Sequence, residues 1–571
     1  MKKKLLAVLF LITPIITFAQ EKGLDQKIDE AFKPISDFFS SIIFFPIYKN
    51  ETIEVPFVLL LLVVSATFFT IYFKFPNFIY FKKAIDIVRG KYEDIEAHGA
   101  QMLYGEDGIA QGVDFNKVDD IDKHIDELSS DLAIDGDIKD TIRDESSSGE
   151  VSHFQALATA VSGTVGNGNI AGVALAIALG GPGATFWMVV CGFLGMSTKF
   201  VECTLGVQYR DVGEDGTVYG GPMYYISKGL KERGFEMMGK IIAVIFAIFC
   251  IGGSFGGGNA AQSNQATVVL KELMGLESTA AGAIIGVVLA LLVGVIIIGG
   301  IKRIASVTEK VVPFMAILYL LACFYILGVN FSLIDDAFAL IYREAFNPTA
   351  IGVGGFIGVL LVGFKRAAFS NEAGAGSASI AHSAVKTKYS ASEGLVALLE
   401  PFIDTVVICT MTALVIIIFN FGGDASGATI FQYGGDGAGA VMIDGETFEG
   451  AGITSKAFAA YIPYSNVFLT VAVVLFAVST MISWSYYGLQ SWKYLFGRGK
   501  TADMLYKLLF LLFVVIGAAA SMKSIWDFSD AMIFAMVFPN MIGLFFLFPV
   551  VKKQLTRYLG AIKLKHDALK D

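Results

Sequence analysis

Charged residues are scarce in this sequence. Only 17% of its 571 residues are Asp, Glu, Lys or Arg, whereas 55% are hydrophobic. A soluble domain carries about 25% charged residues. Apolar runs such as 55–73 and 280–300 reach the length of a membrane-spanning helix, which needs roughly 20 apolar residues. The alternating ten-residue segments of an outer-membrane barrel are absent. The composition therefore predicts an all-α polytopic membrane protein.

Cysteine and histidine are also rare, with five residues of each. The cysteines lie in or beside apolar runs and do not pair by spacing, so we interpret them as small core residues. No His/Cys cluster suggests a transition metal. No metalloprotease HExxH pattern is present, which argues against an intramembrane enzyme. The sequence has no basic stripe of the kind that binds nucleic acid.

The N-terminus has the pattern of a signal peptide over residues 1–19. Lys2, Lys3 and Lys4 precede an apolar stretch at 5–17, and Phe18-Ala19-Gln20 resembles a cleavage site. A short uncleaved anchor is the alternative. Residues 20–55 would then form a periplasmic segment, and the mature N-terminus would lie outside.

We expect about eleven spanning helices after the signal. They centre near 56–75, 154–179, 184–207, 241–269, 280–300, 309–329, 351–383, 394–420, 463–491, 504–521 and 528–550. Alternate loops are rich in Lys and Arg, and such loops face the cytoplasm. This pattern predicts a multi-pass protein of the bacterial inner membrane with a cytoplasmic tail at 551–571.

Two connecting segments stand out in composition. The loop at 76–150 would be cytoplasmic and carries an acidic insert at about 92–147. We interpret the insert as a solvated helical segment, with a regulatory role as the alternative. The Gly- and Asp-rich segment 422–460 is expected to form a solvated cap on the outside.

Two predicted spans contain stretches that should not be regular helix. They are 163–172 and 369–377, where Gly is combined with Asn, Ser or Thr. Irregular backbone at membrane depth survives only where it is buried or lines a cavity. Paired interruptions in two halves point to a transporter's binding site. We therefore predict two five-helix inverted repeats, at 151–330 and 351–550, each opening with a broken helix, plus one extra helix at 56–75. Chance symmetry among Gly-rich helices is the alternative.

The breaks offer complementary chemistry for an amino acid. The half-helix that starts near Asn169 would present N–H groups and a positive dipole end to a carboxylate. The half-helix that ends near Phe369 would present carbonyl groups to an ammonium group or a sodium ion. The predicted substrate-binding residues are Thr164, Gly166, Asn167, Gly168, Phe255, Gln262, Ser370, Asn371, Gly374 and Trp484.

Both breaks lie in long motifs that resemble the alanine or glycine:cation symporter family. The first motif runs from Gly149 to Arg210 and includes GGPGATFWM at 180–188; the second is FKRAAFSNEAGAGSASIAHSA at 364–384. The resemblance covers about 56–91 and 148–550. It implies a LeuT-like core and Na⁺-coupled uptake of alanine or glycine.

The resemblance also suggests a sodium site, because helix eight of a LeuT-like core lies against the first broken helix. Its predicted ligands are Ser162, Val165, Asn169, Ser479 and Thr480. The alternative is that these hydroxyl groups bond back to their own helices.

Ionisable residues within spans are functional candidates by default. Glu372 would pair with Lys365 or Arg366; capping of the half-helix that starts at the second break, sodium ligation and proton coupling are the alternatives. Glu400 and Asp404, one turn apart, would act as interhelical locks.

The function that these features predict is sodium-coupled symport of a small neutral amino acid. A proton-coupled transporter, a channel and a transporter-like sensor are the alternatives. The expected partners are alanine or glycine and membrane lipid, with Na⁺ as coupling ion and no organic cofactor. The oligomeric state is left open, and a monomer is compatible with the sequence.

Overall fold

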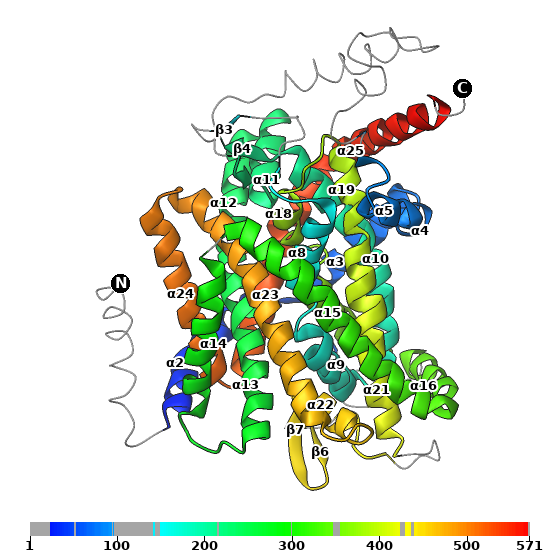
Figure 1. Ribbon diagram of the computed structural model, residues 1–571, viewed down its shortest axis with the longest axis vertical. Helices are drawn as coiled ribbons and strands as arrows, with labels where there is room; N and C mark the ends of the chain where they lie inside the picture. The colour runs from blue at the N-terminus through cyan, green and yellow to red at the C-terminus, as the bar shows by residue number, and fades with distance from the viewer. Residues whose placement is uncertain are drawn as a thin grey trace.

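A computed structural model describes residues 23–50, 53–93, 95, 141–142, 149–213, 216–298, 300–346, 355–422, 429–434 and 439–568. The predicted signal peptide and nearly all of the acidic insert lie outside these residues. The described chain is a bundle of long helices that share one main direction (Figure 1). Short strands occur only in connecting segments of the described chain.

Helices lie at all eleven predicted segments. Seven described helices are long and apolar enough to cross a membrane, or eight when the bent pair at the first break is counted as one span. Two further segments, α3 and α14, are shorter apolar helices of 16 and 17 residues. The remaining one is α17, a 17-residue helix that carries Lys365 and Arg366 near its end. The prediction of an all-α polytopic protein is confirmed. The spanning segments are α3 (Phe57–Tyr72); α8 (His153–Thr164), η2 (Gly168–Gly172) and α9 (Val173–Gly180); α10 (Gly183–Gln208); α12 (Glu236–Phe255), η3 (Gly256–Ala260) and α13 (Ala261–Met274); α14 (Ala281–Ile297); α15 (Gly300–Val329); α17 (Gly355–Asn371) and α18 (Ala378–His382); α19 (Ser390–Ala397), α20 (Leu399–Pro401), η6 (Phe402–Cys409) and α21 (Thr410–Asn420); α23 (Ser465–Phe496); α24 (Lys500–Ala519); and α25 (Met522–Ala568).

The connecting elements are shorter. They are α2 (Leu24–Ile43), β1 (Pro46–Lys49), β2 (Glu54–Pro56), α4 (Pro76–Ile79), α5 (Phe81–Val88), β3 (Thr141–Ile142), β4 (Asp211–Gly213), β5 (Val218–Tyr219), α11 (Pro222–Glu232), η4 (Phe331–Leu333), α16 (Ile334–Phe346), β6 (Ala440–Ile443), β7 (Glu446–Glu449) and α22 (Ala451–Ala459). Strand β3, at the end of the predicted insert, pairs antiparallel with β4.

Ten of the spanning segments follow in two runs of five, and each run opens with an interrupted helix. In the first run, α8 and the helix after it meet at an angle of 51° across a three-residue break. In the second, α17 ends at Asn371 and α18 begins at Ala378. Helices α8 and α23 pack together, as do α10 and α17, so the two runs interlock rather than forming separate bodies.

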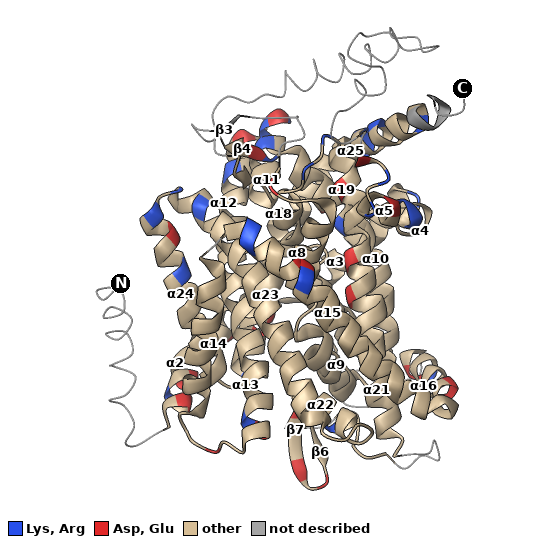
Figure 2. Cartoon of the chain, in the orientation of Figure 1, with Lys and Arg blue, Asp and Glu red and all other residues tan. Residues whose placement is uncertain are grey.

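Lys and Arg residues gather at one end of the bundle, around α5, α11, the start of α24 and the C-terminal part of α25 (Figure 2). We call this the basic end. The hairpin β6–β7, α22 and α16 lie at the opposite end (Figure 1).

Strand β7 is largely exposed, but the burial of α22 contradicts the prediction of a solvated cap over 422–460. Most residues of α22 are buried, and Thr454 Oγ1 donates a hydrogen bond to the Ile170 carbonyl at 3.2 Å. The sequence AGITSKAFA carries enough apolar surface to pack into the bundle, and it covers η2 from the end opposite the basic end.

Candidate functional site

The first break is closed by side chains rather than left open. Helix α8 begins with a capping box in which Ser152 and Gln155 bond to each other's backbone N–H groups. It ends at Thr164, and the Oδ1 atom of Asn169 then accepts the Gly166 N–H at 2.9 Å. The Asn169 side chain therefore reaches back across the turn that precedes it.

Gln262 on α13 holds the other side of this turn. Its side-chain Oε1 atom accepts the Asn167 backbone N–H at 2.9 Å, and its backbone carbonyl accepts a hydrogen bond from Asn167 Nδ2 at 3.1 Å. Two of the N–H groups expected to bind a carboxylate are thus bonded within the protein. Among the described residues, the Gly168 N–H keeps no such partner.

The second break is built around Glu372. This residue has a left-handed backbone (φ 56°), an unusual conformation for a non-glycine residue. Its carboxylate accepts hydrogen bonds from Trp484 Nε1 at 2.8 Å and from Ser377 Oγ. Both carboxylate oxygens are therefore held, and the strained turn is fixed by α23.

One internal cavity lies between the two breaks. Its walls come from both broken helices, from η3 and α13, and from α23 and α25. The lining residues are Gly163, Thr164, Gly168, Gly257, Gln262, Phe369, Ser370, Glu372, Thr480, Trp484 and Ile533. The space for the centre of a water molecule is about 10 Å³, room for roughly one water. The site is therefore closed in this conformation.

Five of the ten predicted substrate-binding residues line this cavity, together with Thr480 of the predicted sodium site and Glu372 of the charged residues. The other five substrate residues lie elsewhere. Gly166 and Asn167 form the turn behind it, and Asn371 donates to Thr405 Oγ1 at 3.0 Å. Gly374, with φ 95°, packs against Leu62 of α3.

Phe255 stacks on Phe513 of α24, with ring centroids 4.6 Å apart, and so faces away from the cavity. The reason is the π-helical stretch η3, which inserts an extra residue and rotates the following face by about 100°. Gln262 therefore reaches the cavity, whereas Phe255 does not.

The predicted sodium ligands separate into two groups. Thr480 Oγ1 donates to the Ser162 carbonyl at 3.0 Å, and Ser162 Oγ donates to the Ser479 carbonyl at 2.8 Å. Val165 is the C-cap residue that follows the last residue of α8, close to this contact. The Ser479 hydroxyl bonds back to Phe476 on its own helix at 3.0 Å, as the alternative reading expected.

Asn169 belongs to a different cluster around Asp404. The Asp404 carboxylate accepts hydrogen bonds from Asn169 Nδ2 at 2.6 Å, Ser370 Oγ at 3.1 Å and Thr405 Oγ1 at 2.6 Å. Asp404 thus joins the two breaks through polar groups rather than through a basic partner.

The predicted pairing of Glu372 with Lys365 or Arg366 is wrong. Both bases pair with Asp530 of α25, with Lys365 Nζ at 2.9 Å from its carboxylate. They lie almost two turns before Glu372 on α17, and the left-handed turn at Glu372 directs that side chain toward α23 instead. The sequence offered Asp530 as an acid at the start of the last span.

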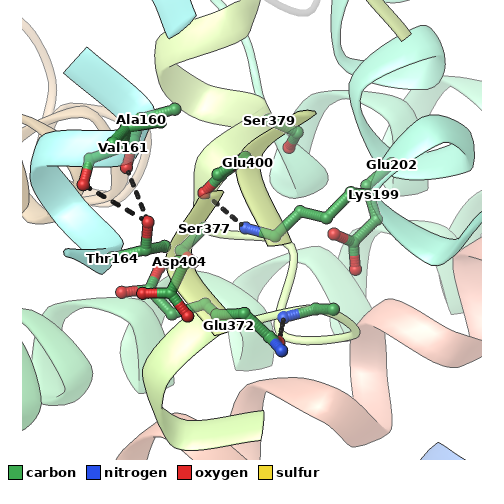
Figure 3. A network of polar contacts seen from close by, with 12 residues as sticks. Ala160, Val161, Thr164, Lys199, Glu202, Glu372, Ser377, Ser379, Glu400 and Asp404 are labelled. Carbon is green, nitrogen blue, oxygen red and sulfur yellow. Dashed lines mark hydrogen bonds and ion pairs between the residues drawn. The ribbon is translucent and has the colours of Figure 1, made fainter. Parts of the chain in front are cut away.

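The buried partner of Glu400 is Lys199, which sequence reasoning missed. Lys199 Nζ lies 2.9 Å from Glu400 Oε1, and both side chains are fully buried (Figure 3). Glu202, one turn further along α10, accepts a hydrogen bond from Asn540 at 2.7 Å. Two charged residues within the apolar run of α10 were the signal that could have revealed this cluster.

The family assignment follows from comparison with known proteins. A model of the sodium:alanine symporter family matches residues 134–570. The chain belongs to this family. It is a family of symporters rather than enzymes, and both breaks lie inside the matched region.

Several known proteins are similar to this chain along most of its length. The sodium/alanine symporter AgcS of Methanococcus maripaludis is 42% identical over 410 residues, which cover 72% of this chain and 84% of the relative. The probable sodium/glutamine symporter GlnT of Bacillus subtilis is 33% identical over 423 residues, covering 74% and 81%. The crystal structure of MhsT in complex with L-phenylalanine gives a TM-score of 0.43 at 12% identity, covering 71% of this chain and 99% of that one.

Proposed function

We propose that this chain takes up a small neutral amino acid, alanine or glycine, together with Na⁺. The observation that carries the proposal is a cavity to which both broken helices contribute, lined by seven of the residues expected from the sequence. The chain's family and its similarity to a sodium/alanine symporter support the same substrate class.

The walls of the cavity suit a zwitterion. The Gly168 N–H lies at the start of η2, where helix N-terminal groups favour a carboxylate. Glu372 places a carboxylate on the opposite break, where it can accept an ammonium group. Trp484, Phe369 and Ile533 fill the remaining wall, so a small side chain needs the least rearrangement.

The contact between α8 and α23 is the proposed sodium site. The Ser162 carbonyl and the Thr480 hydroxyl meet there, and hard cations prefer such oxygen ligands. Asn169 is not part of this proposal, because the Asp404 cluster engages its side chain.

We further propose that the basic end faces the cytoplasm of a bacterial inner membrane. Lys and Arg gather there (Figure 2), as the positive-inside rule expects. The C-terminal tail would then be cytoplasmic and α2 would lie outside.

Radiolabelled alanine uptake into proteoliposomes tests the function. Uptake should collapse when choline replaces Na⁺ at constant pH. In Thr480→Val, the Na⁺ concentration for half-maximal uptake should rise about tenfold or more. The variant loses one oxygen ligand of the ion, which we take to cost about 1.5 kcal/mol, as much as a hydrogen bond to a charged group. Ser479→Ala is the matched control and should change little, since its hydroxyl bonds to its own helix. Undiminished uptake in choline would refute sodium coupling.

A further inference from the structure

Asn540 of α25 is a fully buried amide that bonds to three other segments of the chain. Its Nδ2 atom donates to the Gly374 carbonyl at 2.8 Å and to Glu202 Oε1 at 2.7 Å. Its Oδ1 atom accepts a hydrogen bond from the Tyr225 hydroxyl group. An amide side chain has two N–H donors, and both are used here. Asn540 therefore ties the second break to α10, α11 and α25.

The carbonyl that Asn540 binds lies in the turn between α17 and α18. Three residues of this turn, Glu372, Gly374 and Gly376, have left-handed backbones, with φ of 56°, 95° and 84°. One hydrogen bond within the turn runs from the Ala375 N–H to the Glu372 carbonyl at 3.0 Å. Irregular backbone at membrane depth needs partners from the surrounding protein. For the Gly374 carbonyl, that partner is Asn540.

The turn is also packed tightly on two sides. A Cβ at Gly376 would lie 2.9 Å from Asn540 Cγ and 3.0 Å from its Nδ2 atom. A Cβ at Gly374 would lie 2.2 Å from Leu62 Cδ2 and 2.8 Å from Met541 Cε. Both positions exclude a side chain and both have positive φ, so both require glycine. The backbone of the turn is thus held between α25 and α3, with the Asn540 amide directly against it.

The position of this turn determines where the Glu372 carboxylate lies. Glu372 lines the cavity and is the proposed acceptor of the substrate's ammonium group. Its carboxylate also accepts a hydrogen bond from Ser377 Oγ, on the far side of the turn. Gly374 lies between these two residues, so the bond to its carbonyl fixes the stretch that carries both. A ligand binds more tightly to groups that are already held in the bound geometry.

The first break is held in a comparable way by Gln262 of α13. There the amide oxygen accepts the Asn167 backbone N–H, whereas at the second break the amide nitrogen donates to a backbone carbonyl. Gln262 lines the cavity, but Asn540 is not among the lining residues. Asn540 therefore acts on the cavity only through the turn that it holds.

We propose that Asn540 is a positioning residue for substrate binding. By bonding to the Gly374 carbonyl, it keeps the turn in the shape that presents Glu372 to the ammonium group. The proposal rests on the proposed transport function. Loss of the Asn540 amide nitrogen should weaken alanine binding in a protein that remains folded.

An exchange of two side chains separates this role from a purely structural one. In the double variant Asn540→Asp, Glu202→Gln, the amide introduced at 202 can donate to the carboxylate introduced at 540, and the net charge is unchanged. That carboxylate can still accept from Tyr225, but it has no N–H for the Gly374 carbonyl. Thermal unfolding should therefore stay near the wild-type temperature. The Kd for alanine, measured by calorimetry in the presence of Na⁺, should rise about fivefold, the worth of one hydrogen bond.

Asn540→Ala and Asn264→Ala form a matched pair of single variants. Asn264 of α13 is also buried, and it donates to two carbonyls at the end of α24, those of Gly517 and Ala520, at 3.0 Å each. Both variants should lower the unfolding temperature, because each leaves buried groups without their donors. Only Asn540→Ala should raise the Kd for alanine, again about fivefold.

Amide hydrogen exchange in residues 372–379 measures the turn independently of transport. Without alanine, it should be about fivefold faster in Asn540→Ala and in the double variant than in wild type, and unchanged in Asn264→Ala. This exchange pattern in a protein whose wild type does not bind alanine would refute the proposed function and leave the hold of Asn540 on the turn supported. Wild-type exchange in the double variant, a wild-type Kd in that variant, or an equal rise in Kd in Asn264→Ala would overturn the proposal.

Discussion

Two buried asparagines show how single residues shape the binding region. Asn169 accepts the Gly166 N–H through Oδ1 while its amide nitrogen donates to Asp404. Asn167 binds Gln262 through both its backbone and its side chain. Unpaired backbone groups at membrane depth are costly, so these side chains make the interrupted helix tolerable and also fix its shape.

Two glycines in this turn should respond differently to an added methyl group. A Cβ at Gly166 would lie 2.4 Å from Thr480 Oγ1 and 3.0 Å from Gln262 Oε1, whereas a Cβ at Gly168 would lie at an ordinary 3.4 Å from Ser370. Gly166→Ala should therefore displace the α8–α23 contact and reduce alanine uptake at least tenfold. Gly168→Ala should insert and fold normally and mainly raise the KM, because its methyl group enters the cavity.

Uptake kinetics, with thermal unfolding as a check on folding, would measure both variants. Equal effects of the two substitutions would mean that the turn is not held as the structure indicates.

At the scale of elements, three π-helical stretches surround the cavity region. They are Gly168–Gly172, Gly256–Ala260 and Phe402–Cys409. Such stretches are frequent at functional sites because each adds a residue and redirects the side chains that follow. Here they bring Gln262 into the cavity and Asp404 against Asn169.

The sequence predicted some of this arrangement and missed other parts for physical reasons. Gly-rich stretches located both breaks, and Thr480 and Trp484, which were selected from the sequence, both line the cavity. Phe402–Cys409 has no glycine to suggest a π-helix, so the Asp404–Asn169 contact was not predicted. Nor could spacing identify the partner of Glu372, since a left-handed turn decides where that side chain points.

In the ion pair between α10 and α20, removing one member alone should destabilise the protein far more than replacing both members together. Lys199→Met leaves Glu400 buried without its cation, and removing one member of a buried pair costs about 3–5 kcal/mol. The double variant Lys199→Met, Glu400→Gln should recover most of that loss.

Thermal unfolding of the purified single and double variants would measure the effect. A double variant no more stable than Lys199→Met alone would contradict this account of the pair.

On the scale of the whole molecule, the cavity is covered at both ends. Helix α22 covers η2 at one end. At the basic end, Glu393 contacts both His153 and His382, and a backbone bridge joins Val151 to Val385. The conformation is therefore occluded, with the two broken helices as the parts whose ends must move.

The acidic insert should be dispensable for transport. The family match begins at residue 134, and residues 96–140 are not among the residues that the structure describes. Replacing 96–133 by a short Gly-Ser linker, which keeps the matched region and strand β3 at Thr141–Ile142, should leave the KM for alanine within about threefold, since surface loops tolerate large changes in length. A correctly inserted deletion protein without uptake would show that the insert takes part in transport.

Helix α2 imposes a delay on the assembly of this molecule. Its Ser36 hydroxyl donates to the Ser524 carbonyl, 488 residues later in the chain, and Phe32 packs edge-on against Phe528. At a synthesis rate of about 5–20 residues per second, the nascent α2 waits roughly 25–100 s for its partner to leave the ribosome. Throughout that interval its apolar face needs another cover, such as the membrane surface or a chaperone. Helix α25, which is made about 490 residues after α2, thus completes the docking of α2.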